Sequence, residues 1–246
     1  MFAVAVLASG IAAADTIVAT GVDNALAETI YIDENGTDTS ETAGVIDIQL
    51  TGSSGTVDRY TMCVDLFTNI NEGTTYNTTI YFPSQITSPA SEAAILERIA
   101  WLEDNALLPT LYPGDPSTLP STDWASTPAM GAGLQLAIWD IEVDGGDGFS
   151  AGQVQAWTGK TNPTNATVLQ WATTYETLSS GQSSNVAFVY ENVARTYPYA
   201  AAQTLEGPSY NDGGPHPTTP ESSTFVLAGV ALLALGRMAR RKLVSH

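Results

Sequence analysis

Cys63 is the single cysteine of the 246-residue chain, and it lies in a strand-like segment, residues 60–66, that reads YTMCVDL. A cysteine thiolate is a strong nucleophile, so this residue could form a covalent bond with an electrophile beside it. No disulfide can form within a chain that has one cysteine. On this segment alone two interpretations stay open, a nucleophile and a buried, inert thiol.

Gln135 is the second residue with a chemical setting of interest, in the apolar run Leu134-Gln135-Leu136-Ala137-Ile138-Trp139. On a helix, Gln135, Ile138 and Trp139 share one face because they are spaced i, i+3 and i+4. A buried carboxamide on that face needs hydrogen-bond partners. The run by itself also fits an ordinary amphipathic helix with Gln135 at the margin of the core.

Taken together, the two segments resemble the thioester domains of Gram-positive surface adhesins, the TQXA type. That family has a cysteine on a strand and, later in the chain, a helical motif of apolar-Gln-x-x-apolar-Trp. Residues 62–65 (MCVD) and 134–139 (LQLAIW) match these two motifs, and residues 99–102 (IAWL) match the helix between them. Leu134 stands where the family often has threonine. The resemblance covers about residues 60–140.

The resemblance implies an internal thioester, formed when the Cys63 thiolate attacks the Gln135 side-chain carbonyl and ammonia leaves. It further implies that Leu134, Ile138 and Trp139 shield this bond from water until an amine on a surface or matrix molecule attacks it. Such a protein is an adhesin that reacts once, not an enzyme, and it needs no cofactor and no metal.

The charge balance excludes one class of partner. The chain has 26 acidic and 8 basic residues, a net charge of −18, and four of the basic residues lie in its last ten. An acidic body repels nucleic acid, so we expect no nucleic-acid partner. The two histidines, His216 in a Pro/Gly-rich stretch and His246 at the last position, are not placed for a catalytic triad or a histidine zinc site.

Other functions stay open beside the covalent adhesin. The main alternative is a non-covalent extracellular matrix or carbohydrate-binding module in which Cys63 is inert. A glycan hydrolase would use two carboxylates, but no pair stands out among the 26 acids. The acidic run from Asp140 to Asp147 resembles a calcium loop, although Ala151 stands where an EF-hand needs glutamate. The sequence leaves calcium binding there open.

Both ends of the chain have the composition of export signals. Residues 1–14 are apolar and end in small residues, so we expect a signal peptide whose natural start lies upstream. At the other end an apolar segment, 225–236, separates a short polar motif from a basic cluster. The motif is Pro220-Glu221-Ser222, and the cluster is Arg237, Arg240 and Arg241.

This tail resembles the PEP-CTERM sorting signal of exopolysaccharide-producing Gram-negative bacteria, with Ser222 in place of the second proline. The resemblance implies transient anchoring in the inner membrane, cleavage by an exosortase, and residence at the cell surface or in the extracellular matrix. We therefore expect a folded domain at 15–205, a linker at 206–224 and a sorting tail at 220–246.

The elements that position Cys63 and Gln135 are expected to form an α+β domain, a β-rich sandwich or barrel-like sheet with an inserted helical subdomain. Thr/Val/Ile/Tyr-rich segments between turn residues predict strands, and apolar residues at helical spacing predict helices. The predicted strands are 16–20, 28–33, 45–51, 57–66, 76–82, 186–191 and 199–205. The predicted helices are 92–106, 129–141 and 165–178.

Overall fold

The computed structural model describes residues 15–34, 36–86, 90–112, 117–159, 163–192 and 204–208. The predicted signal peptide and sorting tail, including Pro220, Glu221, Ser222, Arg237, Arg240 and Arg241, lie outside these ranges. In the part of the chain that is described, no helix is both long enough and apolar enough to cross a membrane.

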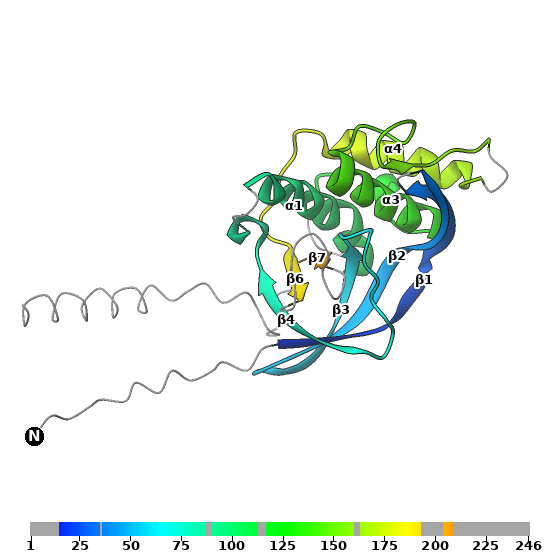
Figure 1. Ribbon diagram of the computed structural model, residues 1–246. Coiled ribbons are helices and arrows are strands. Elements are labelled where there is room, and N and C mark those ends of the chain that lie inside the picture. The colour runs from blue at the N-terminus through cyan, green and yellow to red at the C-terminus, as the bar shows by residue number, and fades with distance from the viewer. Residues whose placement is uncertain are drawn as a thin grey trace, which may run out of the picture. The chain divides into compact units, whose positions relative to one another are not determined.

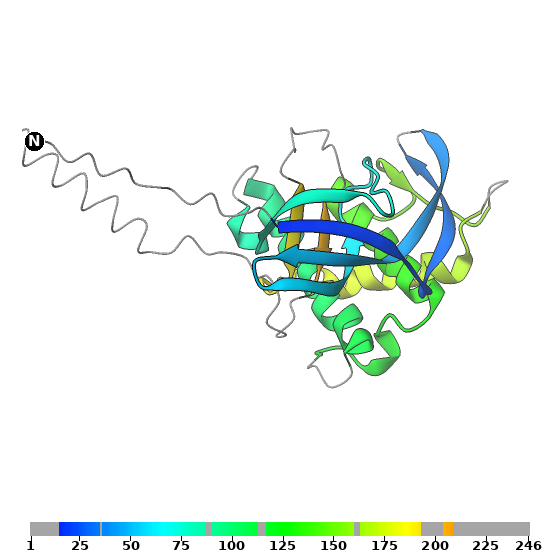
Figure 2. The same cartoon turned by 90° about the horizontal axis from the view of Figure 1, so that it is seen from below.

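The strands form a seven-stranded antiparallel sheet (Figure 1). Its order is β2-β3-β7-β6-β4-β1-β5, and β1 also pairs with β2. The strands are β1 (Asp15–Glu34), β2 (Thr37–Gly52), β3 (Gly55–Cys63), β4 (Thr75–Tyr81), β5 (Val154–Gln155), β6 (Phe188–Asn192) and β7 (Leu205–Gly207). Near the start of β1, residues 16–18 pair with β4 on one edge and with β2 on the other (Figure 2). Six strands therefore pair in a closed series, from β1 through β2, β3, β7, β6 and β4 back to β1.

Most of the predicted strands are confirmed. The predicted strand 57–66 ends at Cys63, and there are two further differences. Segments 16–20 and 28–33 belong to one long strand, β1, which has register shifts against β2 between Ala19 and Gly21 and between Val22 and Ala27. Of the predicted strand 199–205, residues 199–203 lie outside the described ranges. Strand β7 runs from Leu205 to Gly207, two residues past the predicted domain end at 205. Glu206 is fully buried there, so the chain is still part of the core at this point.

The helices lie between β4 and β6 in the sequence, and these two strands are neighbours in the sheet. The longer ones gather on one side of the sheet in Figure 1. They are α1 (Ala90–Leu102), α3 (Pro128–Asp144) and α4 (Ala166–Ser179). A π-helical turn, η2 (Glu103–Leu107), and the short α2 (Leu108–Leu111) follow α1. The predicted helices 92–106, 129–141 and 165–178 are confirmed, and so is a mixed fold of strands and helices.

Helix α3 lies at the centre of the domain. Thr127 caps its start by accepting a hydrogen bond from the Met130 backbone N–H (3.3 Å), and Gly145 ends it in the left-handed conformation at φ +77°. All twelve residues from Met130 to Ile141 are buried, because the helix packs against β1, β2, α1 and α4. The alternative of an amphipathic helix with Gln135 at the core margin is therefore wrong, since α3 is buried on all sides.

Two glycines allow the close packing of α3. A Cβ atom at Gly131 would lie 2.0 Å from the Leu26 carbonyl oxygen in β1, and one at Gly133 would lie 2.7 Å from Trp171 Cβ in α4. No larger residue fits at either distance without a shift of the helix. These two contacts set the position of Gln135, which follows Gly131 by four residues and Gly133 by two.

Candidate functional site

The site is built at the end of β3, where one edge of the strand is left open. Cys63 is the last residue of β3 and pairs with Leu205 of β7 on one edge. On the other edge, pairing with β2 ends at Thr61, opposite Ile46. Beyond that point β2 continues only with β1. The backbone N–H and C=O of Cys63 consequently face α3 instead of another strand.

The carboxamide of Gln135 fills this open edge. Its Oε1 accepts a hydrogen bond from the Cys63 backbone N–H at 2.9 Å, and its Nε2 donates to the Cys63 carbonyl oxygen at 2.6 Å. The side chain thus pairs with Cys63 as a peptide group of a neighbouring strand would. Both polar ends of the carboxamide have a partner, which offsets the cost of burying it. The structure brings together the two residues that the sequence singled out.

The surroundings of this pair are dry. Cys63 is 4% exposed and Gln135 is 1% exposed. The three residues predicted as a shield, Leu134, Ile138 and Trp139, are all buried as well. Ile138 and Trp139 share the helix face of Gln135, whereas Leu134 is turned from it by about 100°. The geometry therefore favours Ile138 and Trp139 over Leu134 as the wall of the site.

The Cys63 thiol is held in its protonated form. Burial raises its pKa well above the ordinary value, and the carboxylates of Asp65, Glu142 and Glu41 raise it further. The Trp139 indole N–H acts in the opposite direction, because it favours the thiolate. The thiol donates to the Asp65 carbonyl oxygen at a sulfur–oxygen distance of 3.7 Å. At neutral pH the sulfur is a thiol, so any reaction here needs an activated carbonyl.

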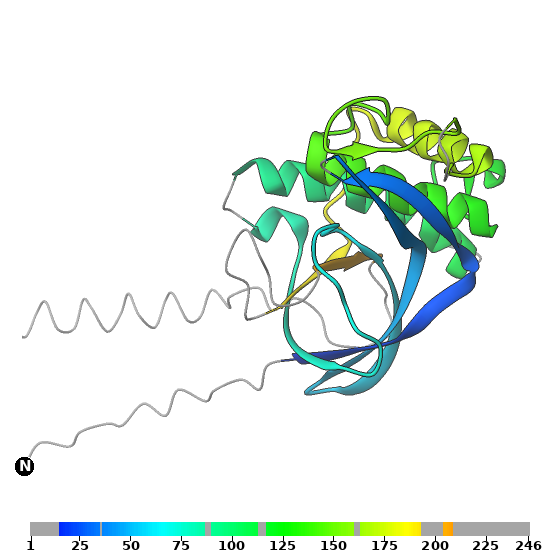
Figure 3. The ribbon, with the colours of Figure 1, turned by 45° about the vertical axis from the view of Figure 1, so that its right-hand side comes forward.

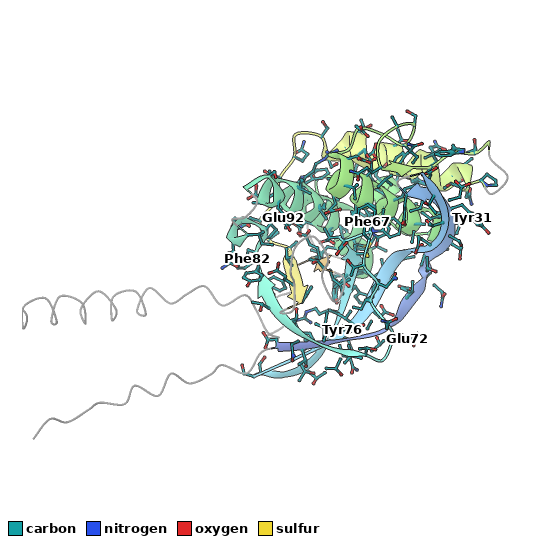
Figure 4. The ribbon with its side chains drawn as sticks, in the orientation of Figure 1. Tyr31, Phe67, Glu72, Tyr76, Phe82 and Glu92 are labelled. Carbon is teal, nitrogen blue, oxygen red and sulfur yellow. The ribbon has the colours of Figure 1, made fainter. Side chains whose placement is uncertain are left out.

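The turn after Cys63 is fixed by the next acidic residue. The Asp65 carboxylate accepts hydrogen bonds from the Phe67 backbone N–H (3.1 Å) and from the Thr68 hydroxyl. Phe67 itself is 46% exposed and lies on the surface (Figure 4). The chain thus passes from the buried Cys63 to the surface within four residues.

Two buried carboxyl groups beside the site are not predicted by any sequence pattern. Glu206 of β7 is paired with Met62, the residue before Cys63, and Glu103 lies in the π-helical turn. Both side chains are fully buried, and among the described residues no hydrogen-bond donor reaches their carboxyl oxygens. Burial and the charge of Glu206 raise the pKa of Glu103 well above its usual range, and burial does the same for the pKa of Glu206. The charges that raise the pKa of the Cys63 thiol are those of Asp65, Glu142 and Glu41. We therefore assign Glu103 and Glu206 to the core beside the site.

No protein-family model, no curated protein and no solved structure matches this chain. The candidate site is therefore described by its own residues and their geometry.

Proposed function

We propose that this chain is an exported surface protein that forms an internal thioester between Cys63 and Gln135 and uses it once to bind an amine covalently. The observation that carries the proposal is the pair of hydrogen bonds between the Gln135 carboxamide and the Cys63 backbone, at 2.9 and 2.6 Å. These hydrogen bonds hold the side-chain carbonyl group of Gln135 beside Cys63, the residue that carries the nucleophile. Proximity of this kind removes much of the entropic barrier to bond formation.

The bond-forming step would use the same hydrogen bonds. The Cys63 sulfur attacks Gln135 Cδ, the Cδ–Nε2 bond breaks, and the thiol proton leaves with the nitrogen as ammonia. Negative charge develops on Oε1 in the intermediate, where the Cys63 backbone N–H already donates. One such donor stabilises an oxyanion by about 3 kcal/mol. The products are a Cys63–Gln135 thioester and one ammonia.

A thiol with a raised pKa does not argue against this step. A reaction that needs to occur once, over about an hour, tolerates a barrier of about 22 kcal/mol. Because the reaction occurs once, it does not need the rate of an enzyme that turns over many substrates. It therefore needs no histidine base at Cys63.

The second step is the capture of a target. A primary amine attacks the acyl carbon of Gln135, a stable amide forms, and Cys63 is released as a free thiol. The Trp139 N–H would assist by favouring the thiolate as it leaves. Ile138 and Trp139, both buried, would keep water from the thioester until the amine arrives.

The composition and the ends of the chain support a surface role. The acidic body would attract cationic amines from solution. We place the protein at the cell surface or in the extracellular matrix, after transient anchoring by the 225–236 segment and processing by an exosortase. We also propose a barrel-like sheet with an inserted helical subdomain. This finer fold is supported by the pairings that return from β4 through β1 to β2, and by the position of the helices between β4 and β6.

A non-covalent binding module is the second candidate, and a cavity favours it. A cavity of about 670 Å³ lies between α4 and the loop before it, and its lining includes Phe149, Trp157 and Leu169. Aromatic and aliphatic walls of this size suit a small organic ligand or a sugar ring. In this alternative Cys63 stays a free, inert thiol throughout.

The decisive reagent is a biotinylated primary amine incubated with the purified full chain. The thioester predicts one label per chain, located by peptide mass spectrometry on Gln135, and one new free thiol for each label. Cys63→Ala and Gln135→Glu should take up no label, whereas Gln182→Glu, at an exposed turn, should react as the wild type does. A wild-type protein that has a free thiol from the start and takes up no label would leave the binding module as the function.

A further inference from the structure

A second polar site lies at the end of α3 and begins with the residue that follows Trp139. Asp140 and Asp144 are spaced i, i+4 on α3, and Asp147 lies in the loop that follows. One carboxylate oxygen from each of the three lies within 4.8 Å of the others. This spacing is compatible with joint coordination of one ion.

The backbone orients two of these carboxylates. Asp144 Oδ2 accepts hydrogen bonds from the backbone N–H groups of Gln153 and Val154, both at 2.8 Å. Asp140 Oδ2 accepts one from the Gly148 N–H at 3.2 Å. Each aspartate thus has one oxygen held by the loop and a second oxygen left for another partner.

The carboxyl group of Glu176, on helix α4, indicates which kind of partner Asp140 requires. Asp140 is fully buried, and its Oδ1 has no donor among the described residues. Glu176 of α4, which lies alongside α3 (Figure 3), is 8% exposed, and its Oε1 also lacks a donor in the described ranges. The two carboxyl groups are within hydrogen-bond reach of each other. Two buried acceptor groups in contact require either a proton or a cation between them.

The nearby guanidinium of Arg98 donates its hydrogen bonds to other groups. Arg98 donates to the carbonyl oxygens of Gly145 (2.8 Å) and Glu176 (3.0 Å) and to the Ser179 hydroxyl (3.1 Å). Its hydrogen bonds therefore go to the backbone and a hydroxyl instead of the carboxylates.

We propose that Asp140, Asp144 and Asp147 bind a divalent cation of the calcium type, with Glu176 as the buried carboxyl group that faces Asp140. The donor set is all oxygen, which suits a hard cation and not zinc or copper. Three ligands come from a helix end and a loop, a framework more adaptable than the rigid octahedron that magnesium requires. The proposal is independent of the thioester, since the cation would join α3, the 145–153 loop and α4 without involving Cys63.

The test is calorimetric titration of the purified full chain with CaCl₂ and, separately, with MgCl₂. Calcium sites of extracellular modules have dissociation constants of about 0.1–1 mM, and we expect a saturable Ca²⁺ isotherm in that range. Asp147→Asn should weaken binding at least about tenfold, because it removes one of three charged ligands. Asp147 is exposed, so this variant should fold as the wild type does. Asp58→Asn, which removes the same charge from an exposed position in β3, should bind Ca²⁺ as the wild type does.

A second variant separates this site from the thioester. Cys63→Ala lacks the proposed nucleophile and should bind Ca²⁺ as the wild type does. Failure of the cation site and failure of the thioester can therefore be told apart.

Three results would overturn the proposal. These are the absence of saturable binding up to about 10 mM Ca²⁺, equal weakening in Asp147→Asn and Asp58→Asn, and loss of Ca²⁺ binding in Cys63→Ala.

Discussion

Helix α3 carries two buried polar side chains five residues apart, Gln135 and Asp140, and their surroundings differ in one decisive respect. The Gln135 carboxamide is neutral, and both of its polar atoms are paired with the Cys63 backbone. The Asp140 carboxylate has a backbone donor for one oxygen, while its other oxygen lies without a donor near a second carboxyl group, that of Glu176.

These surroundings determine what each site is able to do. A neutral, fully paired group keeps its geometry at every pH, so the Gln135 side can hold reacting atoms in place. A buried carboxylate without a partner depends on a proton or a cation, so the Asp140 side responds to the solution. Helix α3 therefore carries two different sites. Hydrogen bonds fix the geometry at Gln135, whereas the protonation or cation binding of carboxyl groups determines the state of the site at Asp140.

The largest effect is expected on the Gln135 side. Gln135→Ala would leave the Cys63 N–H and C=O buried without partners, at about 1–3 kcal/mol each, and would add a cavity. We expect a loss of about 3–5 kcal/mol in the free energy of unfolding, measured by urea denaturation. The exposed Gln182→Ala provides the control. A loss under about 1 kcal/mol would mean that the carboxamide is not held as described.

The position of α3, on which both sites depend, can be tested at Gly131. A Cβ atom there would meet the Leu26 carbonyl oxygen at 2.0 Å, so Gly131→Ala forces the helix away from β1. We expect a loss of about 1–3 kcal/mol and slower uptake of amine label. Gly159→Ala is the matched control, because nothing lies within 4 Å of a Cβ atom at that position. Equal stability of the two variants would show that the helix has room to adjust.

The charge-controlled side should make stability depend on pH. The pKa of Glu176 is raised from 4.5 to about 9, so the folded chain binds a proton that the unfolded chain releases above about pH 4.5. This stabilisation is fully present below that pH and is lost as the pH rises towards 9. Glu103 and Glu206 act in the same direction.

Without divalent cations, we therefore expect the Tm to fall between pH 5 and pH 8, as followed by circular dichroism. The fall should be smaller in Glu176→Gln, whose amide can donate to Asp140 without a titrating proton. A Tm that rises with pH over this interval, or an unchanged slope in the variant, would contradict the assignment.

The smallest effect is expected at the exposed member of the cation cluster. Without Ca²⁺, Asp147→Asn should change the free energy of unfolding by no more than about 0.5 kcal/mol, since the side chain is exposed. With saturating Ca²⁺, the wild type should gain stability over the variant in parallel urea titrations. If the cation stabilises both proteins equally, Asp147 is not a ligand.

The sequence allowed local features to be predicted well. Pro128, the apolar run around Gln135 and the following glycines mark a helix at 129–141, and α3 spans Pro128–Asp144. The pairing of Cys63 with Gln135, 72 residues apart, is implied by the resemblance to thioester domains and by neither segment alone. The structure joins the two residues by two hydrogen bonds.

Features that depend on contacts between distant elements could not be predicted. The Cys63 backbone is available to Gln135 only because β2 separates from β3 beyond Ile46, and no local pattern encodes that separation. The Pro/Gly/Ser-rich composition of residues 206–224 predicts a linker that includes Glu206. The structure instead buries Glu206 in β7. Glu176 lies 36 residues from Asp140, so only the packing of α4 on α3 reveals its role.

The most direct measurement is the intact mass of the purified protein beside its Cys63→Ala variant, before and after incubation with methylamine. A thioester predicts a wild-type mass lower than that calculated from its sequence by one ammonia. Incubation should then add the mass of one methylamine to the wild type and leave the variant unchanged. A wild-type mass equal to the calculated value, with one titratable thiol and no change on incubation, would contradict the covalent function.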